Sequence, residues 1–319
     1  MVFISILWGV GSVAALFFVL NSIGETLPAK ARTIVLPIIF AGPAIAILFW
    51  YLVLPTVRTF MLSFYNDTGT VFVGLKNYIS TFTDGVILES MQNNLLWLIF
   101  GTSGSVGLGL VIAVLADKSR YEKVFKALIF LPMAISFVGA GVIWKFIYAY
   151  KGEGVNIVEI GLLNAIITSM GFKAQAWLQI PFWNNILLII IMIWLQTGYA
   201  MVILSSAIKG IPSSLIEAAR VDGATGFKIF FRITIPYIMG TIVAVSTTIV
   251  IFSLKLFDIV RVMTGGNFGT NVVANEFYLR QFTQGRTGEA SALAILLLIA
   301  VIPVLIYNLK QFQGRKAFK

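Results

Sequence analysis

Long runs of apolar residues dominate this chain, and short polar stretches separate them. Seven runs are close to the ~20 residues that a helix needs to cross a ~30 Å hydrocarbon core. They are residues 2–20, 34–54, 93–116, 127–148, 184–206, 237–257 and 290–308. The runs are continuous rather than alternating, which favours helices over the strands of a membrane barrel. The pattern therefore predicts an all-α fold, a polytopic transmembrane helical bundle with about seven spans.

Composition supports this pattern. The chain of 319 residues is 59% hydrophobic and only 11% charged, which is unlike a soluble domain. Too little sequence remains outside the apolar runs for a separate soluble domain. The first run, 2–20, lacks the basic start and the small-residue cleavage site of a secretory signal, so we interpret it as a retained span.

The net charge of +10 has a topological explanation. If the C-terminus is cytoplasmic, 14 of the 23 Lys and Arg residues fall on the inner side, although the outer segments are longer. They are Lys30, Arg32, Lys118, Arg120, Lys123, Lys126, Lys209, Arg220, Lys228, Arg232, Lys310, Arg315, Lys316 and Lys319. This bias satisfies the positive-inside rule, so the charge gives no reason to expect a nucleic-acid partner. With seven spans the N-terminus is then outside, and the polar stretch 210–236 is inside.

No reaction centre is apparent in the sequence. The chain has no Cys and no His, which excludes disulfides, thiolate chemistry, His- or Cys-held haem and the usual zinc sites. No Gly-Lys pair occurs, so there is no Walker-type phosphate loop, and no Gly-x-Ser-x-Gly nucleophile elbow is present. We therefore expect no catalytic residue and no metal or cofactor site in this chain, and any energy source must lie on a partner.

The stretch 210–236 is the longest polar interruption in the second half of the chain, and its residues predict two short helices. Pro212 suits a first-turn position, Ser213 and Ser214 offer cap hydroxyls, and Gly223 is suited to ending the helix in the left-handed conformation.

The second short helix would begin just after this glycine. Thr225 is a suitable N-cap for it, and Pro236 is expected to limit it at its far end.

The same stretch carries a recognisable spacing. The motif comprises Glu217, Ala218, Ala219, Gly223, Ile233, Ile235 and Pro236. This spacing resembles the EAA loop of bacterial ABC-importer permeases, in which Leu is usual at the position of Ile235. In that family the loop docks into a cleft of a cytoplasmic ATPase and carries its motion to the membrane helices. The resemblance implies that Glu217, Ala218, Ala219, Asp222 and Gly223 couple this chain to an ATPase.

Other stretches resemble the carbohydrate-importer branch of these permeases, and together they cover roughly residues 40–312. They are Leu62–Tyr65 with Gly74–Tyr78, Phe130–Pro132, Trp144, Gly161–Asn164 and Phe257–Gly266. Asn267 stands where the family usually has proline. With Thr270-Asn271 and Ala274-Asn275-Glu276 following, the chain is most similar to the α-glucoside and glucosylglycerol permeases.

The resemblance implies a complete transport machine around this subunit. The fold would be that of an ABC type I importer permease, with residues 1–33 forming an extra N-terminal span and inside link and residues 34–319 forming the transmembrane domain. The expected partners are a second permease subunit in a heterodimer, two ATPase subunits that hold ATP and Mg²⁺, and an extracytoplasmic solute-binding protein. A carbohydrate would pass by alternating access through a chain embedded in the lipid of the bacterial inner membrane.

A sugar needs hydrogen-bonding groups for its hydroxyls and aromatic faces for its C–H side. A helical rise of ~1.5 Å per residue places polar and aromatic residues of the fifth and sixth runs near mid-membrane, and a further asparagine at the outer mouth of the third. These candidates for the substrate pathway are Trp194, Gln196, Thr197, Tyr199, Ser246, Thr247 and Asn94. Interhelical hydrogen bonding is the alternative for each of them.

Two further features have structural and functional interpretations. Gly101, Ser105, Gly109 and Ala113 recur every four residues and predict a helix face for close packing, with space for a ligand as the alternative. Lys255 lies ~28 Å along its helix and is expected at the outer surface, as a snorkelling lysine or paired with Asp258 on one helix face rather than as a substrate ligand.

Two other classes of membrane protein remain alternatives. A seven-helix receptor shares the number of spans and an outer N-terminus. An ion-coupled secondary transporter shares the apolar bundle, although no acidic residue lies deep in the predicted spans, where ion coupling usually needs one. Neither alternative explains the EAA spacing. The identity of the solute is left open.

Overall fold

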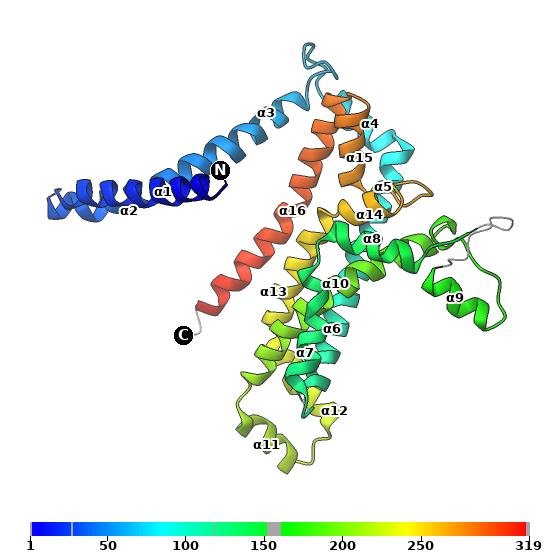
Figure 1. Ribbon diagram of the computed structural model, residues 1–319. Coiled ribbons are helices and arrows are strands. Elements are labelled where there is room, and N and C mark those ends of the chain that lie inside the picture. The colour runs from blue at the N-terminus through cyan, green and yellow to red at the C-terminus, as the bar shows by residue number, and fades with distance from the viewer. Residues whose placement is uncertain (1, 27, 118, 152–160, 317–319) are drawn as a thin grey trace. The chain divides into compact units, whose positions relative to one another are not determined.

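The computed structural model describes residues 2–26, 28–117, 119–151 and 161–316, and these residues form helices and connecting turns, with one isolated bridge between Tyr65 and Phe72 and no strand (Figure 1). The chain divides into two compact units, Met1–Met61 and Leu62–Lys319. The predicted division after residue 33 stays a prediction. Lys118 and Lys319, two basic residues used for the topology, lie outside the described residues.

The first unit is built from two long helices. It contains α1 (Val2–Glu25), α2 (Ala29–Leu48), the π-helical turn η1 (Phe49–Val53) and α3 (Leu54–Leu62), which ends at the unit boundary. Phe17 stacks on Phe40 with ring centroids 5.9 Å apart, so α1 and α2 pack side by side. Their outward surfaces are apolar and exposed, as expected of helices that face lipid.

The second unit contains the remaining helices. Before the long central helix these are α4 (Lys76–Thr83), α5 (Gly85–Leu96), η2 (Trp97–Gly101), α6 (Thr102–Ala116), α7 (Glu122–Phe130), η3 (Leu131–Ala134), α8 (Phe137–Ile147), α9 (Leu162–Ser169) and η4 (Trp177–Gln179). From there the chain forms α10 (Trp183–Lys209), α11 (Ser213–Val221), α12 (Gly226–Ile229), η5 (Phe230–Thr234), α13 (Ile235–Leu254), α14 (Asp258–Met263), α15 (Val273–Tyr278), η6 (Leu279–Thr283) and α16 (Thr287–Lys316).

Six helices in the described part of the chain are long and apolar enough to cross a membrane, or seven if a bent pair counts as one span. The bent pair corresponds to the predicted run 127–148, which is not one straight helix. Its two halves, Glu122–Ala134 and Phe137–Ile147, meet at 102°. Pro132 lies in the short 3₁₀ turn before the bend, and Ser136 starts a new helix by accepting a hydrogen bond from the Gly139 amide at 3.0 Å. A proline followed by a serine cap thus breaks the run.

The core of the second unit lies where α6 packs along α10. All four small residues of the predicted packing face, Gly101, Ser105, Gly109 and Ala113, are buried. A β-carbon at Gly109 would lie 2.5 Å from the Ala200 β-carbon and 2.9 Å from the Met201 amide nitrogen. The backbones of the two helices therefore approach closely only because this position has no side chain. The packing interpretation of this face is confirmed.

Replacing Gly109 by Ala tests this close approach. Because the added methyl meets backbone as well as side-chain atoms, α6 and α10 must separate, and we expect a loss of about 1–3 kcal/mol of stability. Thermal unfolding of the detergent-extracted protein measures the loss. Gly107→Ala on the same helix is the control, since a β-carbon there meets nothing within 4 Å. Equal melting temperatures for both variants would contradict the close contact.

Candidate functional site

The predicted coupling loop, 210–236, contains a short exposed helix with a well-formed end. In α11 the Gly223 amide donates to the Arg220 carbonyl at 3.0 Å, and the Ala224 amide donates to the Ala219 carbonyl at 2.9 Å. Gly223 itself has φ +76°. These two bonds and the left-handed glycine form a Schellman motif, which ends the helix as the sequence predicts.

The start of α11 and the helix beyond it differ from the sequence prediction. Pro212 is the N-cap rather than a first-turn residue, and no side chain caps the helix, so the caps expected from Ser213 and Ser214 are not formed. Thr225 caps α12 through the Lys228 amide, as predicted. Pro236 does not end that helix, because the π-helical turn η5 precedes it and one continuous helix runs from Gly226 to Leu254. The wider turn accommodates the missing proline N–H.

One face of α11 points to solvent and carries the motif residues. Glu217 and Ala218 are exposed, and Val221 on the same face has 88% of its surface accessible. Asp222 and Gly223 are also exposed, whereas Ala219 is half-buried. A carboxylate beside small and apolar residues on a short projecting helix is a surface suited to contact with another protein.

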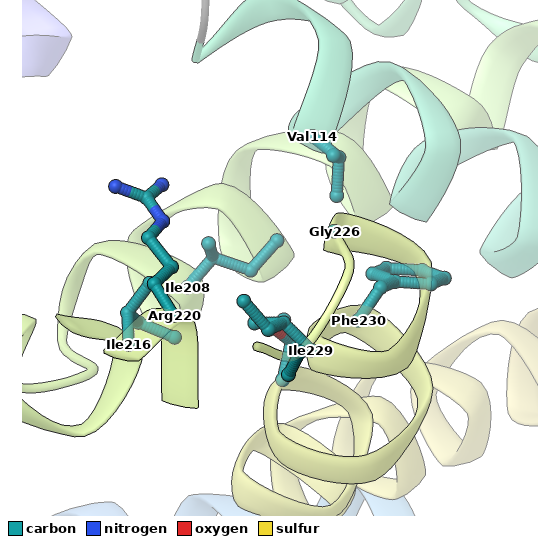
Figure 2. A pocket seen from close by; sticks show the side chains of 9 residues that line it. Val114, Ile208, Ile216, Arg220, Gly226, Ile229 and Phe230 are labelled. Carbon is teal, nitrogen blue, oxygen red and sulfur yellow. The ribbon is translucent and has the colours of Figure 1, made fainter. Parts of the chain in front are cut away.

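The other face of α11 borders a cavity of about 310 Å³ (Figure 2). Ile216 and Arg220 line it from α11, Ile208 from α10, and Ile229 and Phe230 from the segment after the loop. In Figure 2 the Arg220 guanidinium points away from the Ile229 side chain. The helix is therefore loosely packed against the bundle on this face.

A second cavity, of about 200 Å³, lies at the bend between α7 and α8. Gln196 and Tyr199 line it from α10, and Gln196 has only 5% of its surface exposed. The apolar lining residues are Met133, Ile135, Phe137, Leu195 and Phe252. Two of the predicted pathway residues are thus brought together at a broken helix, next to the aromatic pair Phe137 and Phe252.

The structure does not bring the other predicted pathway residues to this cavity. The Trp194 ring meets the Trp144 ring edge-on at 5.7 Å, and the Thr197 hydroxyl donates to the Ile193 carbonyl of its own helix at 2.6 Å. Ser246 is half-buried and Thr247 buried on α13, and neither lines the cavity. Sequence reasoning missed the apolar lining, although Pro132 and Ser136 were the signal for the bend that forms it.

Asn94 has a structural partner on the segment between α13 and α16. Its side-chain oxygen accepts a hydrogen bond from the Val273 amide at 2.8 Å, and Asn93 donates to the Gly269 and Asn271 carbonyls. From α10, Asn184 and Asn185 donate to the Phe268 and Gly269 carbonyls. Four asparagines of two helices therefore hold one irregular backbone segment, residues 268–273.

A buried ionic cluster follows this segment in the chain and is centred on Arg280. Arg280, with 3% of its side chain exposed, donates from Nε to Glu276 at 2.7 Å and from Nη2 to Asp84 at 2.6 Å, and it also pairs with Glu289. Asn271, quoted above for the α-glucoside resemblance, donates to the same Glu276 at 2.7 Å. The cluster thereby ties the N-termini of α5 and α16 to η6.

The protonation of the cluster follows from its contacts. Burial opposes the charged guanidinium, but hydrogen bonds to Asp84 and Glu276 and the charge of Glu289 outweigh it and raise the pKa of Arg280. Burial likewise favours protonated Asp84, but the Arg280 hydrogen bond and the Val86 amide hold the pKa of Asp84 below its ordinary value.

Lys255 lies just beyond the end of α13 and is exposed, as predicted. Of the two alternatives for Lys255, the ion pair with Asp258 is wrong, because α13 ends at Leu254 and α14 begins only at Asp258, so no helix places the two on one face. Both residues are described, and no ion pair joins them.

The long apolar helices, the projecting loop helix and the cavity at a broken helix are features expected of a membrane transport subunit. Among the described residues, no group of three or more His, Cys, Asp or Glu residues is arranged to hold a metal ion.

The comparison with known families agrees with a membrane transport subunit. The profile described as "Binding-protein-dependent transport system inner membrane component" matches residues 105–319, and the chain belongs to this family. It is a multi-pass inner-membrane permease subunit of an ABC importer, and ATP hydrolysis lies in a partner. This membership excludes the receptor and the ion-coupled transporter.

Two relatives are highly similar. The chain is 54% identical to the "Osmoprotective compounds uptake permease protein GgtC" of Synechocystis sp., over 88% of this chain and 100% of the relative. It is 48% identical to the "Alpha-glucoside transport system permease protein AglF" of Rhizobium meliloti, over 86% and 81%. A crystal structure of a bacterial ABC transporter that imports the acidic polysaccharide alginate has the same fold, with a TM-score of 0.73 and 21% identity over 85% of this chain and 93% of that chain.

Asp84→Asn tests the ionic cluster, because Asn keeps the N-cap of α5 and removes only the charge. Since the folded-state pKa of Asp84 is depressed, its ionised form stabilises the fold at neutral pH, and this contribution is lost as the pH falls through the folded-state pKa. At pH 7 we expect the variant to lose about 1–3 kcal/mol of stability and therefore to unfold at a lower temperature. The difference should shrink below about pH 4. A pH-independent difference in thermal unfolding would contradict this assignment.

Proposed function

We propose that this chain imports an α-glucoside, glucosylglycerol or a similar oligosaccharide or polyol, as one of two different permease subunits in the complex. The observation that carries this proposal is the high similarity over most of the chain to permeases named for osmoprotective compounds and α-glucoside uptake. The complex would also contain two ATPase subunits, which hold ATP and Mg²⁺, and an extracytoplasmic solute-binding protein. This chain itself would need no cofactor.

The cavity at the bend of α7 and α8 supports a carbohydrate substrate. The Gln196 amide and the Tyr199 hydroxyl can donate and accept hydrogen bonds, which matches sugar hydroxyls. Phe137 and Phe252, whose ring centroids are 6.4 Å apart, supply apolar surface for the C–H face of a ring. Few polar groups in a mostly apolar cavity are typical of small-molecule sites. Trp194, Thr197, Ser246 and Thr247 then act in helix packing or at another stage of alternating access.

The orientation follows from the basic residues. With the C-terminus in the cytoplasm and the N-terminus outside, α11 projects into the cytoplasm, where an ATPase can meet it. Glu217 would pair with a basic residue of the ATPase cleft, while Ala218 and Ala219 keep the helix narrow enough to enter it. Asp222 and Gly223 set the turn that follows.

Reconstitution of the complete complex tests the substrate. We expect the binding protein loaded with an α-glucoside to stimulate ATP hydrolysis and solute uptake in proteoliposomes, and Gln196→Leu to weaken uptake because the amide can no longer bond the sugar. Thr248→Val is the matched control, since its hydroxyl donates to the Ala244 carbonyl of its own helix. Stimulation by an unrelated solute alone would contradict the carbohydrate assignment. Unchanged uptake by Gln196→Leu would remove the cavity from the pathway.

Gly223→Val tests coupling through α11. Because φ is +76° at this position, a β-branched residue is strained by about 1–2 kcal/mol and must reshape the turn. We expect ATP hydrolysis to continue while sugar uptake falls, measured as sugar transported per ATP in proteoliposomes. Gly226→Val is the control, because Gly226 has an ordinary helical φ and open space around its β-position. Normal uptake by Gly223→Val would contradict the coupling role.

A further inference from the structure

A compact network of charged residues joins three helices at the end of α10 that leads to the coupling loop. Lys126 on α7 pairs with Asp117, just after α6, and with Glu122 at 2.6 Å. Ser205 on α10 donates to Asp117 at 2.7 Å and contacts the Lys126 ammonium. Lys209, in the last turn of α10, pairs with Glu122. We call these five residues the base clamp.

The base clamp is electrically balanced, and its Asp117–Lys126 pair is largely shielded from water, whereas the Lys209 side chain is 52% exposed. It contains two carboxylates and two ammonium groups, and the side chains of Asp117 and Lys126 are 14% and 18% exposed. Ion pairs with so little exposure hold a more definite geometry than surface pairs. The four charges sum to zero, and their contacts join α6, α7 and α10 to one another.

The base clamp lies directly beside the coupling helix in sequence. α10 ends at Lys209 and α11 begins at Ser213, so only three residues separate the base clamp from the helix that would meet the ATPase. The Ile211 amide donates to the Ile208 carbonyl at 3.1 Å, which keeps this link short. A displacement of α11 therefore acts on the last turn of α10, which the base clamp links to α6 and α7.

The same helices continue to the cavity at the bend. α7 leads through η3 into the bend that contains Met133 and Ile135, and α10 carries Gln196 and Tyr199. Beside the cavity, α7 and α10 contact each other through their backbones, since a β-carbon at Gly198 would lie 2.6 Å from the Ile129 carbonyl oxygen. A rigid path of helix and backbone contact thus connects the base clamp to the cavity.

We propose that Lys126 and Asp117 are positioning residues of the transport cycle. Their base clamp makes α6, α7 and α10 move as one body, so that displacement of α11 reshapes the cavity at the bend. This proposal rests on the proposed docking of α11 to an ATPase. The base clamp stays closed throughout the cycle, and movement occurs between this body and its surroundings rather than within it.

A cysteine placed in the cavity at the bend reports on changes in the accessibility of that cavity. The chain contains no cysteine, so Met133→Cys introduces its only thiol, at a residue that lines the cavity and is 42% exposed. In the full complex with cysteine-free partners, the rate of maleimide labelling is compared with and without ATP trapped by vanadate. We expect trapping to change the rate in the otherwise unmodified chain. Lys126→Met should abolish this response while nucleotide is still trapped.

Matched variants separate charge from packing. Lys126→Arg keeps the cation and should restore the response, and Lys123→Met, which removes an exposed lysine of the same helix, should leave it intact. An equal change in labelling rate in Lys126→Met and in the chain without this substitution would contradict the proposed role of the base clamp but not the docking of α11. A missing response in the unmodified chain would overturn the docking of α11 and the base clamp together. This readout does not depend on which solute is transported.

A covalent replacement provides the second test. Asp117→Cys with Ser205→Cys removes two members of the base clamp, and a short bifunctional thiol reagent can then join α6 to α10. We expect sugar uptake by the complex to fall in the double variant and to recover on cross-linking, because the body needs only to be held together. Cross-linking that blocks uptake until the linker is cleaved would overturn the proposal, since it would show that this contact opens during the cycle.

Discussion

The close contact between α6 and α10 is the constraint on which the rest of the second unit depends. It requires Gly109 opposite Ala200, and no larger residue fits without separating the helices. Lipid provides no hydrophobic drive between helices, so such contacts are stabilised by dispersion over a closely matched surface. Once α10 is held against α6, its other faces are available to the broken span, to α13 and to the cavity at the bend.

Polar residues gather at the two ends of the packed helices α6 and α10, and their contacts differ between the two ends. At the end that carries Asn184 and Asn185, side-chain amides hold the backbone of an irregular segment and lead to the buried Arg280 cluster. At the other end, the charges of Asp117 and Lys126 link helix to helix beside the coupling loop. In both places most of the buried polar groups are paired, although Asp117 Oδ2 and Asn185 Oδ1 have no hydrogen-bond partner in the protein. The described middle of the bundle has few polar side chains, and Gln196 and Tyr199 border the cavity at the bend.

The apolar runs were sufficient to predict the fold class and the approximate spans, because a membrane helix is specified mainly by length and hydropathy. The left-handed Gly223 was equally predictable, since few other residues adopt that conformation. The bend before Ser136 and the continuous helix through Pro236 were not, because a proline can break a helix or be absorbed by a π turn, and the neighbouring helices decide which occurs. Asn94 illustrates a further limit: a buried amide looks the same in sequence whether its partner is a solute or a backbone amide 179 residues away.

Among the described residues of this unit, α10 is the one long helix with no proline, π turn or bend within it, from Trp183 to Lys209. By contrast, η2 interrupts the helix of α5 and α6, η5 interrupts that of α12 and α13, and α16 contains Pro303. Twenty-seven residues give a rod of roughly 40 Å, with the asparagine tethers at one end and the coupling loop at the other. A helix of this kind has no built-in site for a sharp kink. If α11 docks as proposed, a displacement at that end of α10 would also move the end held by the asparagines, and the two ends of the subunit would be mechanically linked even where no side chain connects them.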